Sequence, residues 1–504
     1  MTQNKLNKNL KNKIQQLKKN KKKIGLVHGV FDVIHVGHLL YFEEAKKKVD
    51  FLIVSVTADR FAEKAPGKPL FELNSRIKIL KSLKLIDYVI ESHSPTAVKV
   101  INEIKPDFYF KGKDYKNYKD LSGNLNKEMQ AIKKVNGSFV ITESKLSSSS
   151  EIINKKFNFI NDEAQVFLRN KSTKSLIEKI DTIKNLNEKI LVIGDPVLDI
   201  YREVSPSGKS NKANVLSARI IGEKIYAGGA LLVSNIMKNF ANNVTYAYCD
   251  NKNNNSYINK LLNKKIKKIK IKCKTNFIEK IRYIDDYYHT KLFQVTQNEE
   301  SEIDKFSKKQ FLNFIKNNYR KYDKIFVFDY GYYTIFEDIL KLLNNNLSIR
   351  NKLIINCQSN SYNFGFNLPI KYKFGGIMAM DEIEFRLCCG NRKKNLKKLI
   401  TENMKLFKNF KILLVTQGKT GCYIIYNKKL YFIPTLFKFS KDTIGCGDVF
   451  LTLFGLAMTT KNFDIVESAL ISHVAAGIHA NNFGNENTLT EYKLLSTIKN
   501  IIKK

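Results

Sequence analysis

Two short segments of the chain carry residue types that handle phosphate groups. Residues 28–38 read HGVFDVIHVGH, so His35 and His38 stand three positions apart directly after a short apolar run. If a helix begins there, both imidazoles share one face near its N-terminus, where backbone amides and the helix dipole favour an anion. Such a pair could stabilise charge developing on the α-phosphate of a nucleoside triphosphate as pyrophosphate leaves. Taken alone, HxGH also fits two packed or metal-linked histidines.

The second segment, residues 442–448, reads DTIGCGD and precedes the apolar stretch VFLTLFGLAM. The backbone amides of Gly445, Cys446 and Gly447 could form a nest for a transferring γ-phosphoryl group at a helix N-terminus. Asp448 would then stand close to an acceptor hydroxyl and act as a general base. The plainer alternative is that Asp448 only caps the helix.

The surrounding pattern predicts an α/β fold that positions both segments. Apolar runs and helical periods alternate over residues 24–153, which predicts a parallel sheet with helices on both faces. The run KILVIG at 189–194 opens a second α/β domain, with buried-strand candidates at residues 324–328, 353–356 and 412–416. We therefore expect a basic leader (1–23), an N-terminal domain (24–153), a polar, helix-prone linker (154–188) and a C-terminal domain (189–504).

Composition excludes some classes of protein. The net charge of +39 could indicate a nucleic-acid or anionic-membrane partner. However, Lys and Asn are abundant everywhere and are not gathered beside an aromatic cluster, so we ascribe the charge to compositional drift and expect no specific nucleic acid. No apolar run approaches the roughly 18 residues of a membrane span. The seven cysteines lack CxxC pairs, which favours a reduced, cytoplasmic protein.

The N-terminal domain resembles the cytidylyltransferase-like nucleotidyltransferases, which have a Rossmann-like parallel sheet. The resemblance begins at residues 29–59 and continues through KPLFELNSRIKIL (68–80), IKPDFYFKGKDY (104–115) and SSSSEII (147–153). It implies that His35 and His38 are catalytic and contact the triphosphate. The nucleotide-binding residues that it implies are Gly29, Phe31, His35, His38, Lys46, Arg76, Asp114, Ser148 and Ser149. Lys46 and Arg76 are expected on phosphate groups. Lys68-Pro69 replaces the usual Arg-Pro of heptose adenylyltransferases, which leaves ATP versus CTP open.

Residues 189–500 resemble the ribokinase-like (PfkB) sugar kinases through ILVIGDPVLDIY (190–201), YAGGALLVSN (226–235), VTQGKTGC (415–422) and the GCGD segment. The resemblance implies that Asp448 is the catalytic base. The ATP site that it implies comprises Thr416, Gly418, Gly421, Gly445, Cys446 and Gly447. The implied substrate site comprises Asp199, Gly228, Gly229, Asn235, Lys280 and Arg282. Asp381 and Glu384 replace an Asn-x-x-Glu motif and would hold Mg²⁺ through water.

Three departures from the kinase family lie on the sugar side. Leu232 stands where an Asn is usual, NCQSNSYNFGFN (356–367) replaces an Asp-Pro-Lys segment, and Asp381 replaces the Asn of the Mg²⁺ motif. These changes leave the identity of the acceptor open.

Together the two halves resemble the bifunctional heptose-phosphate kinase/adenylyltransferases, with the domain order reversed. The resemblance implies an ATP-dependent sugar-phosphate kinase and a nucleotidyltransferase that joins NMP from ATP or CTP to a sugar 1-phosphate, as in ADP-heptose and lipopolysaccharide precursor synthesis. It also implies Mg²⁺ at both sites and, by fold analogy, a homodimer.

Three alternatives stay open. One is a cytidylyltransferase for a polyol phosphate fused to a kinase domain. In another, the kinase-like half is divergent or only binds a ligand. A class I aminoacyl-tRNA synthetase is disfavoured because no KMSKS-like loop is present.

Overall fold

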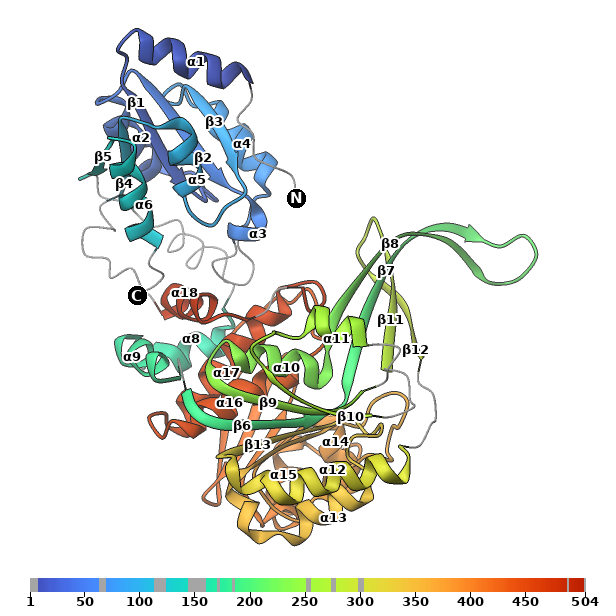
Figure 1. The fold of residues 1–504 in the computed structure, drawn as a ribbon. Coiled ribbons are helices and arrows are strands. Elements are labelled where there is room, and N and C mark those ends of the chain that lie inside the picture. Colours follow the sequence, from blue (N-terminus) through green and yellow to red (C-terminus); the bar gives the residue numbers. More distant parts are fainter. Residues whose placement is uncertain are drawn as a thin grey trace. The chain divides into compact units, whose positions relative to one another are not determined.

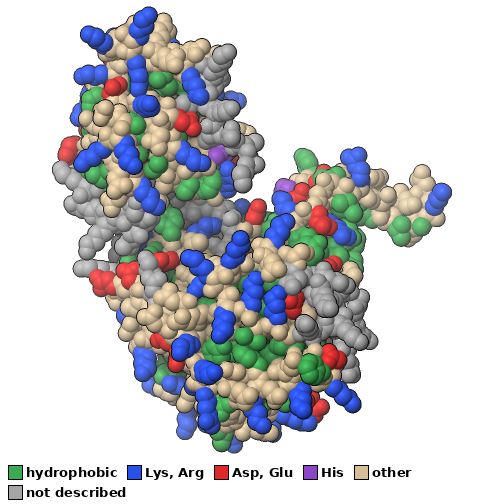
Figure 2. Space-filling view, in the orientation of Figure 1, with side chains coloured by type: hydrophobic (Ala, Val, Ile, Leu, Met, Phe, Trp, Pro, Cys, Tyr) green, Lys and Arg blue, Asp and Glu red, His purple; other side chains and the backbone are tan. Residues whose placement is uncertain are grey.

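The computed structural model divides the chain into two compact units, Met1–Ile160 with Lys499–Lys504 and Asn161–Ile498 (Figure 1). The structure describes residues 8–62, 69–112, 124–143, 160–169, 173–183, 186–250, 255–272, 278–297, 303–486 and 489–502. Within these ranges no helix combines the length and apolarity that crossing a membrane requires. On the face shown in Figure 2, Lys and Arg side chains are scattered over each unit and not gathered into one patch.

The first unit is built on a five-stranded parallel sheet in the order β3-β2-β1-β4-β5. Its strands are β1 Ile24–Gly29, β2 Phe51–Thr57, β3 Tyr88–Ser92, β4 Phe108–Lys111 and β5 Ser138–Ile141. The predicted parallel α/β sheet is therefore confirmed. The strand order reverses between β1 and β4. In open parallel sheets the loops that follow two such strands diverge, and ligands bind in the crevice that they leave at the carboxyl edge.

Helices cover both faces of this sheet because neighbouring residues of each strand point to opposite sides. Val27 of β1 packs with α2 Val36–Lys46 and α4 Leu73–Lys81, whereas Leu26 packs with α1 Lys8–Lys19, α5 Val98–Ile104 and α6 Asn124–Lys134. A short helix, α3 Asp59–Ala62, follows β2. Leu10 and Ile14 of α1 lie one helical turn apart and are buried in this core. Residues 8–19, expected in a leader, thus form part of the N-terminal body.

The second unit is built on a nine-stranded sheet in the order β10-β9-β6-β13-β14-β15-β16-β17-β18. Its strands are β6 Leu186–Gly194, β9 Ala241–Asp250, β10 Lys267–Lys272, β13 Lys324–Asp329, β14 Leu353–Cys357, β15 Gly375–Asp381, β16 Phe410–Thr416, β17 Gly421–Tyr426 and β18 Lys429–Pro434. The run from β10 to β16 is parallel, and β17 and β18 complete the edge as antiparallel strands. The three buried-strand candidates are confirmed as β13, β14 and β16.

Two groups of helices flank this sheet. On one face α12 Lys305–Asn318, α13 Glu337–Asn345, α14 Glu382–Cys389 and α15 Leu396–Asn403 pack over an apolar core. A second group, α10 Gly229–Lys238, α16 Cys446–Thr459 and α17 Ile465–Ala480, packs together with largely buried side chains. The structure also describes α11 Asn255–Leu261 and α18 Glu491–Ile502, which crosses the unit boundary.

Residues 161–183, expected to lie in a linker, belong to the second unit. They form α8 Asp162–Arg169 and α9 Thr173–Ile183, in which most apolar side chains, including Leu168 and Ile180, are buried, whereas Val166 is exposed. The Lys179 ammonium lies 2.6 Å from a carboxylate oxygen of Glu467 on α17. Although the segment is polar in composition, it forms two amphipathic helices that pack on the rest of the second unit.

A small sheet in the order β12-β11-β7-β8 completes the second unit. Its strands are β7 Pro196–Lys209, β8 Leu216–Gly228, β11 Ile278–Asp285 and β12 Lys291–Gln297. Parallel pairing of β7 and β11 sets Asp199 beside Lys280 and Tyr201 beside Arg282. The far ends of β7 and β8 continue as a two-stranded ribbon that projects from the body of this unit (Figure 1).

Candidate functional site

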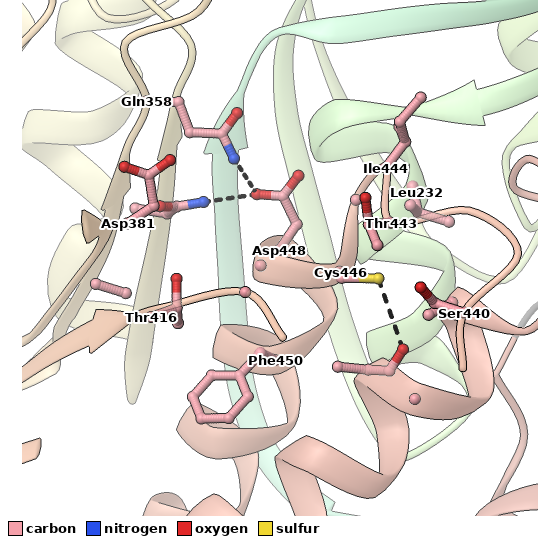
Figure 3. Close-up of a pocket in the computed structure, with 18 of the residues that line it drawn as sticks. Leu232, Gln358, Asp381, Thr416, Ser440, Thr443, Ile444, Cys446, Asp448 and Phe450 are labelled. Atoms are coloured by element: carbon pink, nitrogen blue, oxygen red, sulfur yellow. Dashed lines mark hydrogen bonds between the residues drawn. The ribbon is translucent and has the colours of Figure 1, made fainter. Parts of the chain in front are cut away.

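A cavity of about 600 Å³ lies in the second unit, between the carboxyl edge of the large sheet, the small sheet and the start of α16. Most of the predicted kinase residues line it. They are Asp199, Gly229, Lys280, Arg282, Asp381, Glu384, Thr416, Gly418, Gly421, Gly445, Cys446, Gly447 and Asp448. Segments far apart in the sequence therefore meet in one cavity, part of which Figure 3 shows.

The loop before α16 places a helix N-terminus at the cavity wall. Gly445 occupies the N-cap position with φ of 75°, a left-handed conformation that favours glycine. Asp442 braces the loop, because its carboxylate accepts hydrogen bonds from the Ile444 amide at 3.0 Å and the Tyr201 hydroxyl at 2.8 Å. Lys291 of β12 adds an ion pair at 2.6 Å. Together these groups hold the backbone in the shape of an anion-binding nest.

Asp448 lies in the first turn of α16 and is only 5% exposed. Its Oδ1 accepts hydrogen bonds from Asn356 Nδ2 at 2.6 Å and Gln358 Nε2 at 2.9 Å (Figure 3). Because Gly445 is the N-cap residue, Asp448 does not take the capping position that the plainer alternative assigned to it. Burial raises the pKa of Asp448 to about 6, against the opposing effects of Tyr330 and Lys280. A carboxylate with this pKa is largely ionised at pH 7 and can accept a proton.

The residues predicted to bind the sugar centre on the carboxylate of Asp199. Arg282 Nη1 lies 2.5 Å from Asp199 Oδ1, and Asn485 donates to Oδ2 at 2.8 Å. Gly228 leaves the room for this arrangement, since a Cβ there would overlap Asp199 Oδ2. Lys280 lines the same cavity, and burial lowers its pKa, with Asp199 acting in the opposite direction.

Two predicted sugar-side residues, Gly228 and Asn235, are not among the residues that line the cavity. The Asn235 side chain donates to the Leu261 carbonyl and accepts from the Asn263 amide, both at 2.9 Å. Leu232, one turn earlier on α10, lines the cavity instead. The sugar-side wall therefore carries an apolar side chain here, as the departure at Leu232 indicated.

Around the residues predicted to bind ATP, the cavity is lined by predicted and unpredicted residues. Thr416 ends β16, and Gly418 and Gly421 lie in and beside the turn to β17. The lining residues that the sequence did not single out are Lys419, in the same turn, and Thr435, Phe437 and Lys438, in the β18–α16 connection. His473 and Gly477 of α17 also line the cavity, and they belong to the stretch HVAAGIHANNFG (473–484), which the resemblance to sugar kinases implies on the adenine side.

Asp381 and Glu384, the expected Mg²⁺ residues, form a capping box at the start of α14. Glu384 accepts from the amides of Ser359 at 3.0 Å and Asp381 at 2.7 Å, and Asp381 accepts from the Glu384 amide at 2.7 Å. Burial, reinforced by Asp381, raises the pKa of Glu384. Both Glu384 oxygens are thus engaged by backbone, whereas Asp381 is exposed at the cavity edge. This donor set suits a cation held through water and does not suit direct coordination by both carboxylates.

In the first unit, His35 and His38 lie together at the start of α2, with ring centroids 4.1 Å apart. His35 is the N-cap residue and its Nδ1 accepts from the Gly37 amide at 3.1 Å. Burial lowers the pKa of His35, which favours a neutral ring. The Phe31 ring lies 5.6 Å from that of His38, and Gly29 makes room for it, because a Cβ at Gly29 would come 2.9 Å from Phe31 Cζ. The need for glycine at position 29 therefore follows from the close Phe31 ring, and does not require a bound phosphate.

Lys46 lies at the opposite end of α2 from the histidines, about 16 Å along an 11-residue helix. Its ammonium is 2.5 Å from Asp87 Oδ2 and 2.9 Å from the Asp50 carbonyl. Asp50 and Asp87 immediately precede β2 and β3, so Lys46 sits at the amino edge of the sheet. The structure does not bring Lys46 to the histidine site, and the predicted phosphate contact is replaced by an ion pair.

Arg76 is also turned away from the expected role, because its side chain is fully buried. The guanidinium donates to the carbonyls of Val30, Thr57 and Phe71 and pairs with Asp59. The guanidinium therefore holds together the segments around Val30, Thr57 and Phe71, and its donors are already used within the protein. Three further predicted residues, Asp114, Ser148 and Ser149, lie outside the described residues.

Two regions of the chain match known protein families. Residues 26–156 match the family model described as cytidylyltransferase-like, and residues 376–491 match the pfkB family carbohydrate kinase model. The chain is 34% identical over 121 residues to the bifunctional protein HldE of Helicobacter pylori (strain J99), covering 24% of this chain and 26% of that protein. It is 37% identical over 117 residues to the HldE of Pasteurella multocida (strain Pm70), covering 23% and 24%. Each match spans about a quarter of these curated relatives.

Among solved structures, a mutant of phosphofructokinase-2 from Escherichia coli superposes with a TM-score of 0.50 and 12% identity, covering 63% of this chain and all of that one. At this level of identity the similarity concerns the fold alone. It agrees with the α/β architecture of the second unit, whose cavity contains the GCGD loop.

Proposed function

We propose that this chain, which joins a cytidylyltransferase-like nucleotidyltransferase domain to a pfkB-family carbohydrate kinase domain, is a bifunctional enzyme of nucleotide-sugar synthesis. The kinase domain would transfer the γ-phosphoryl group of ATP to a hydroxyl of a sugar phosphate. The other domain would transfer NMP from ATP or CTP to a sugar 1-phosphate. The similarity to the bifunctional HldE proteins and the heptose-type motifs support an ADP-heptose-like product.

The observation that carries the kinase proposal is Asp448 beside the start of α16. Its carboxylate is buried yet largely ionised at neutral pH, and it would take the proton from the acceptor hydroxyl. The amides of Gly445 to Gly447 would stabilise charge on the transferring phosphoryl group. Lys280, in the same cavity, would add a positive charge on the acceptor side.

In the nucleotidyltransferase domain, His35 and His38 would donate hydrogen bonds to the triphosphate while its α-phosphate is attacked. The position of both rings at the start of α2, in the crevice where the strand order reverses, supports this role. The expected contributions of Asp114, Ser148 and Ser149 stay predictions.

Mg²⁺ would neutralise triphosphate charge at both sites. In the kinase cavity Asp381 would hold it through water, with Glu384 fixing the geometry of Asp381. A homodimer also stays a proposal. It is supported by apolar side chains that the small sheet and its ribbon expose, namely Val215, Leu216, Ile220, Ile221, Phe293 and Val295. The cysteine pattern supports a cytoplasmic setting.

The test follows release of ADP and of pyrophosphate separately, with Mg²⁺, ATP or CTP and a panel of sugar and polyol phosphates. Asp448→Asn should abolish ADP release and spare pyrophosphate release, and His35→Ala/His38→Ala should do the reverse. Asn235→Ala and Lys46→Ala are matched controls, because both side chains lie away from the two sites; each should retain both activities. Pyrophosphate release without ADP, unaffected by Asp448→Asn, would instead favour a polyol-phosphate cytidylyltransferase with a ligand-binding kinase-like domain.

A further inference from the structure

Two amide side chains converge on one oxygen of Asp448. Asn356 Nδ2 and Gln358 Nε2 reach Oδ1 at 2.6 and 2.9 Å, while Oδ2 points away from both amides (Figure 3). An amide oxygen in either position would be repelled by the carboxylate, so the donor orientation is the stable one. Neither residue was singled out from the sequence, where both belong to the unusual segment NCQSNSYNFGFN.

Both amides come from a rigid part of the backbone. Asn356 is paired inside the sheet, between Phe328 of β13 and Ala379 of β15. Gln358, just past the strand, donates from its backbone amide to the Asp329 carbonyl at 2.8 Å, and its own carbonyl accepts from Asn367 Nδ2 at 2.9 Å. The two donors are therefore preorganised, and Asp448 gains a fixed orientation that its own first-turn position would not give it.

We propose that Asn356 and Gln358 are positioning residues that hold Asp448 as an oriented carboxylate and leave Oδ2 as its basic atom. The inference rests on the proposed kinase activity. In the step it serves, the acceptor O–H bond breaks and its proton passes to Oδ2. The acceptor oxygen forms a bond to the γ-phosphorus of ATP as the bond from that phosphorus to the bridging oxygen breaks, and ADP leaves with the electron pair.

The electrostatic surroundings explain why such donors are needed. Burial favours the neutral acid, and the nearby Asp199 carboxylate acts in the same direction. Lys280 and Tyr330 oppose that effect, as do hydrogen bonds to the ionised form such as the one from Asn356. Removing a donor from Oδ1 should therefore raise the pKa of Asp448 and reduce the fraction that is ionised at neutral pH.

The test replaces the donors with isosteric acceptors, Asn356→Asp and Gln358→Glu, and removes one with Gln358→Ala. Gln294→Ala on the exposed face of β12 is the control for amide loss. Protonation of Asp448 is followed by the infrared C=O band of carboxylic acids in protein labelled with ¹³C-aspartate. The spectrum of Asp448→Asn is the baseline that isolates Asp448. The titration needs no substrate. We expect Gln358→Ala to raise the midpoint measurably, the isosteric variants to raise it by more than one pH unit, and Gln294→Ala to leave it unchanged.

Kinetics then separate positioning from a purely structural role. With the sugar phosphate that gives most ADP, Gln358→Glu should lower kcat at pH 6 more than about fivefold, shift the acidic limb of the kcat profile upward and change KM for ATP less than threefold. Unchanged midpoints in all variants, or a rise in KM at constant kcat, would overturn the inference. If the variants shift the titration midpoint of Asp448 but the protein releases no ADP, the positioning of Asp448 by the two amides would be supported and the proposed kinase function would be refuted.

Discussion

Replacing Arg76 tests whether this residue binds phosphate, as its sequence context implies, or braces the fold. Its guanidinium is fully buried and donates to the carbonyls of Phe71 and Thr57, both at 2.9 Å, and to that of Val30. The ion pair with Asp59 Oδ1 measures 2.5 Å. These contacts join the loop after β1, the end of β2 and the approach to α4, so one side chain fixes three segments of the first unit.

The magnitude follows from the groups that Arg76→Met leaves behind. The change keeps much of the side-chain volume but removes every donor, so buried carbonyls lose their partners at about 1–3 kcal/mol each. Asp59 has a side chain that is 44% exposed, so its ion pair adds little. We expect the free energy of unfolding of the first unit to fall by about 4 kcal/mol, a large part of the roughly 5–15 kcal/mol typical of a domain.

Hydrogen exchange measured by mass spectrometry suits this prediction, because the chain has no Trp and two units that need separate readouts. Peptides covering β1 and β2 should exchange roughly 10³-fold faster in Arg76→Met, since each 1.4 kcal/mol is about a factor of ten. Peptides from the second unit should not change, and Lys78→Met, an exposed cation on the same helix, is the matched control. Unchanged exchange combined with weaker nucleoside triphosphate binding would refute the bracing role.

Three further changes test the second unit. Gly228→Ala would overlap Asp199 Oδ2, and we expect KM for the acceptor to rise at least tenfold in the ADP-release assay. Lys291→Met removes the cation beside buried Asp442; because the Lys291 side chain is 35% exposed, we expect calorimetry to detect a loss of only about 2 kcal/mol. Burial raises the pKa of Asp448 from 3.8 to about 6, so wild type should lose about 3 kcal/mol of stability in total as pH rises from about 3 to about 7, and then level off. Asp448→Asn should lack this loss, which unfolding measurements across that pH window would detect.

The parts of the site that could be predicted are those encoded by contiguous residues. Helical geometry alone puts His35 near His38 once a helix begins at residue 36. The same holds for Gly445 to Asp448, where the glycine permits the left-handed turn and the following residues start α16. The parallel sheets likewise follow from the alternation of apolar runs with helical periods.

Contacts that depend on neighbouring strands could not be predicted in this way. Asn356 meets Asp448 only because β14, inside the large sheet, lies against the start of α16. Asn235 was assigned to the sugar from its place in a motif, yet its side chain turns to Asn263. The polar, helix-prone composition of residues 154–188 predicts a linker. Composition does not show that apolar residues such as Ile180 are buried, because their burial depends on a surface formed by other parts of the chain.

Residue type was most misleading for cations and most informative for buried carboxylates. With 86 Lys and Arg side chains, finding Lys46 near a phosphate motif carries little information, and its observed partner is the nearby carboxylate of Asp87. Burying a carboxylate costs free energy unless hydrogen-bond donors compensate it. Asp448 is only 5% exposed and two amides donate to one of its oxygens, which indicates a functional role. Lys280 gains significance from its register beside Asp199 and not from its charge alone. In a chain this basic, a compensated buried carboxylate facing a cavity is therefore better evidence for a reactive site than a lysine in a motif.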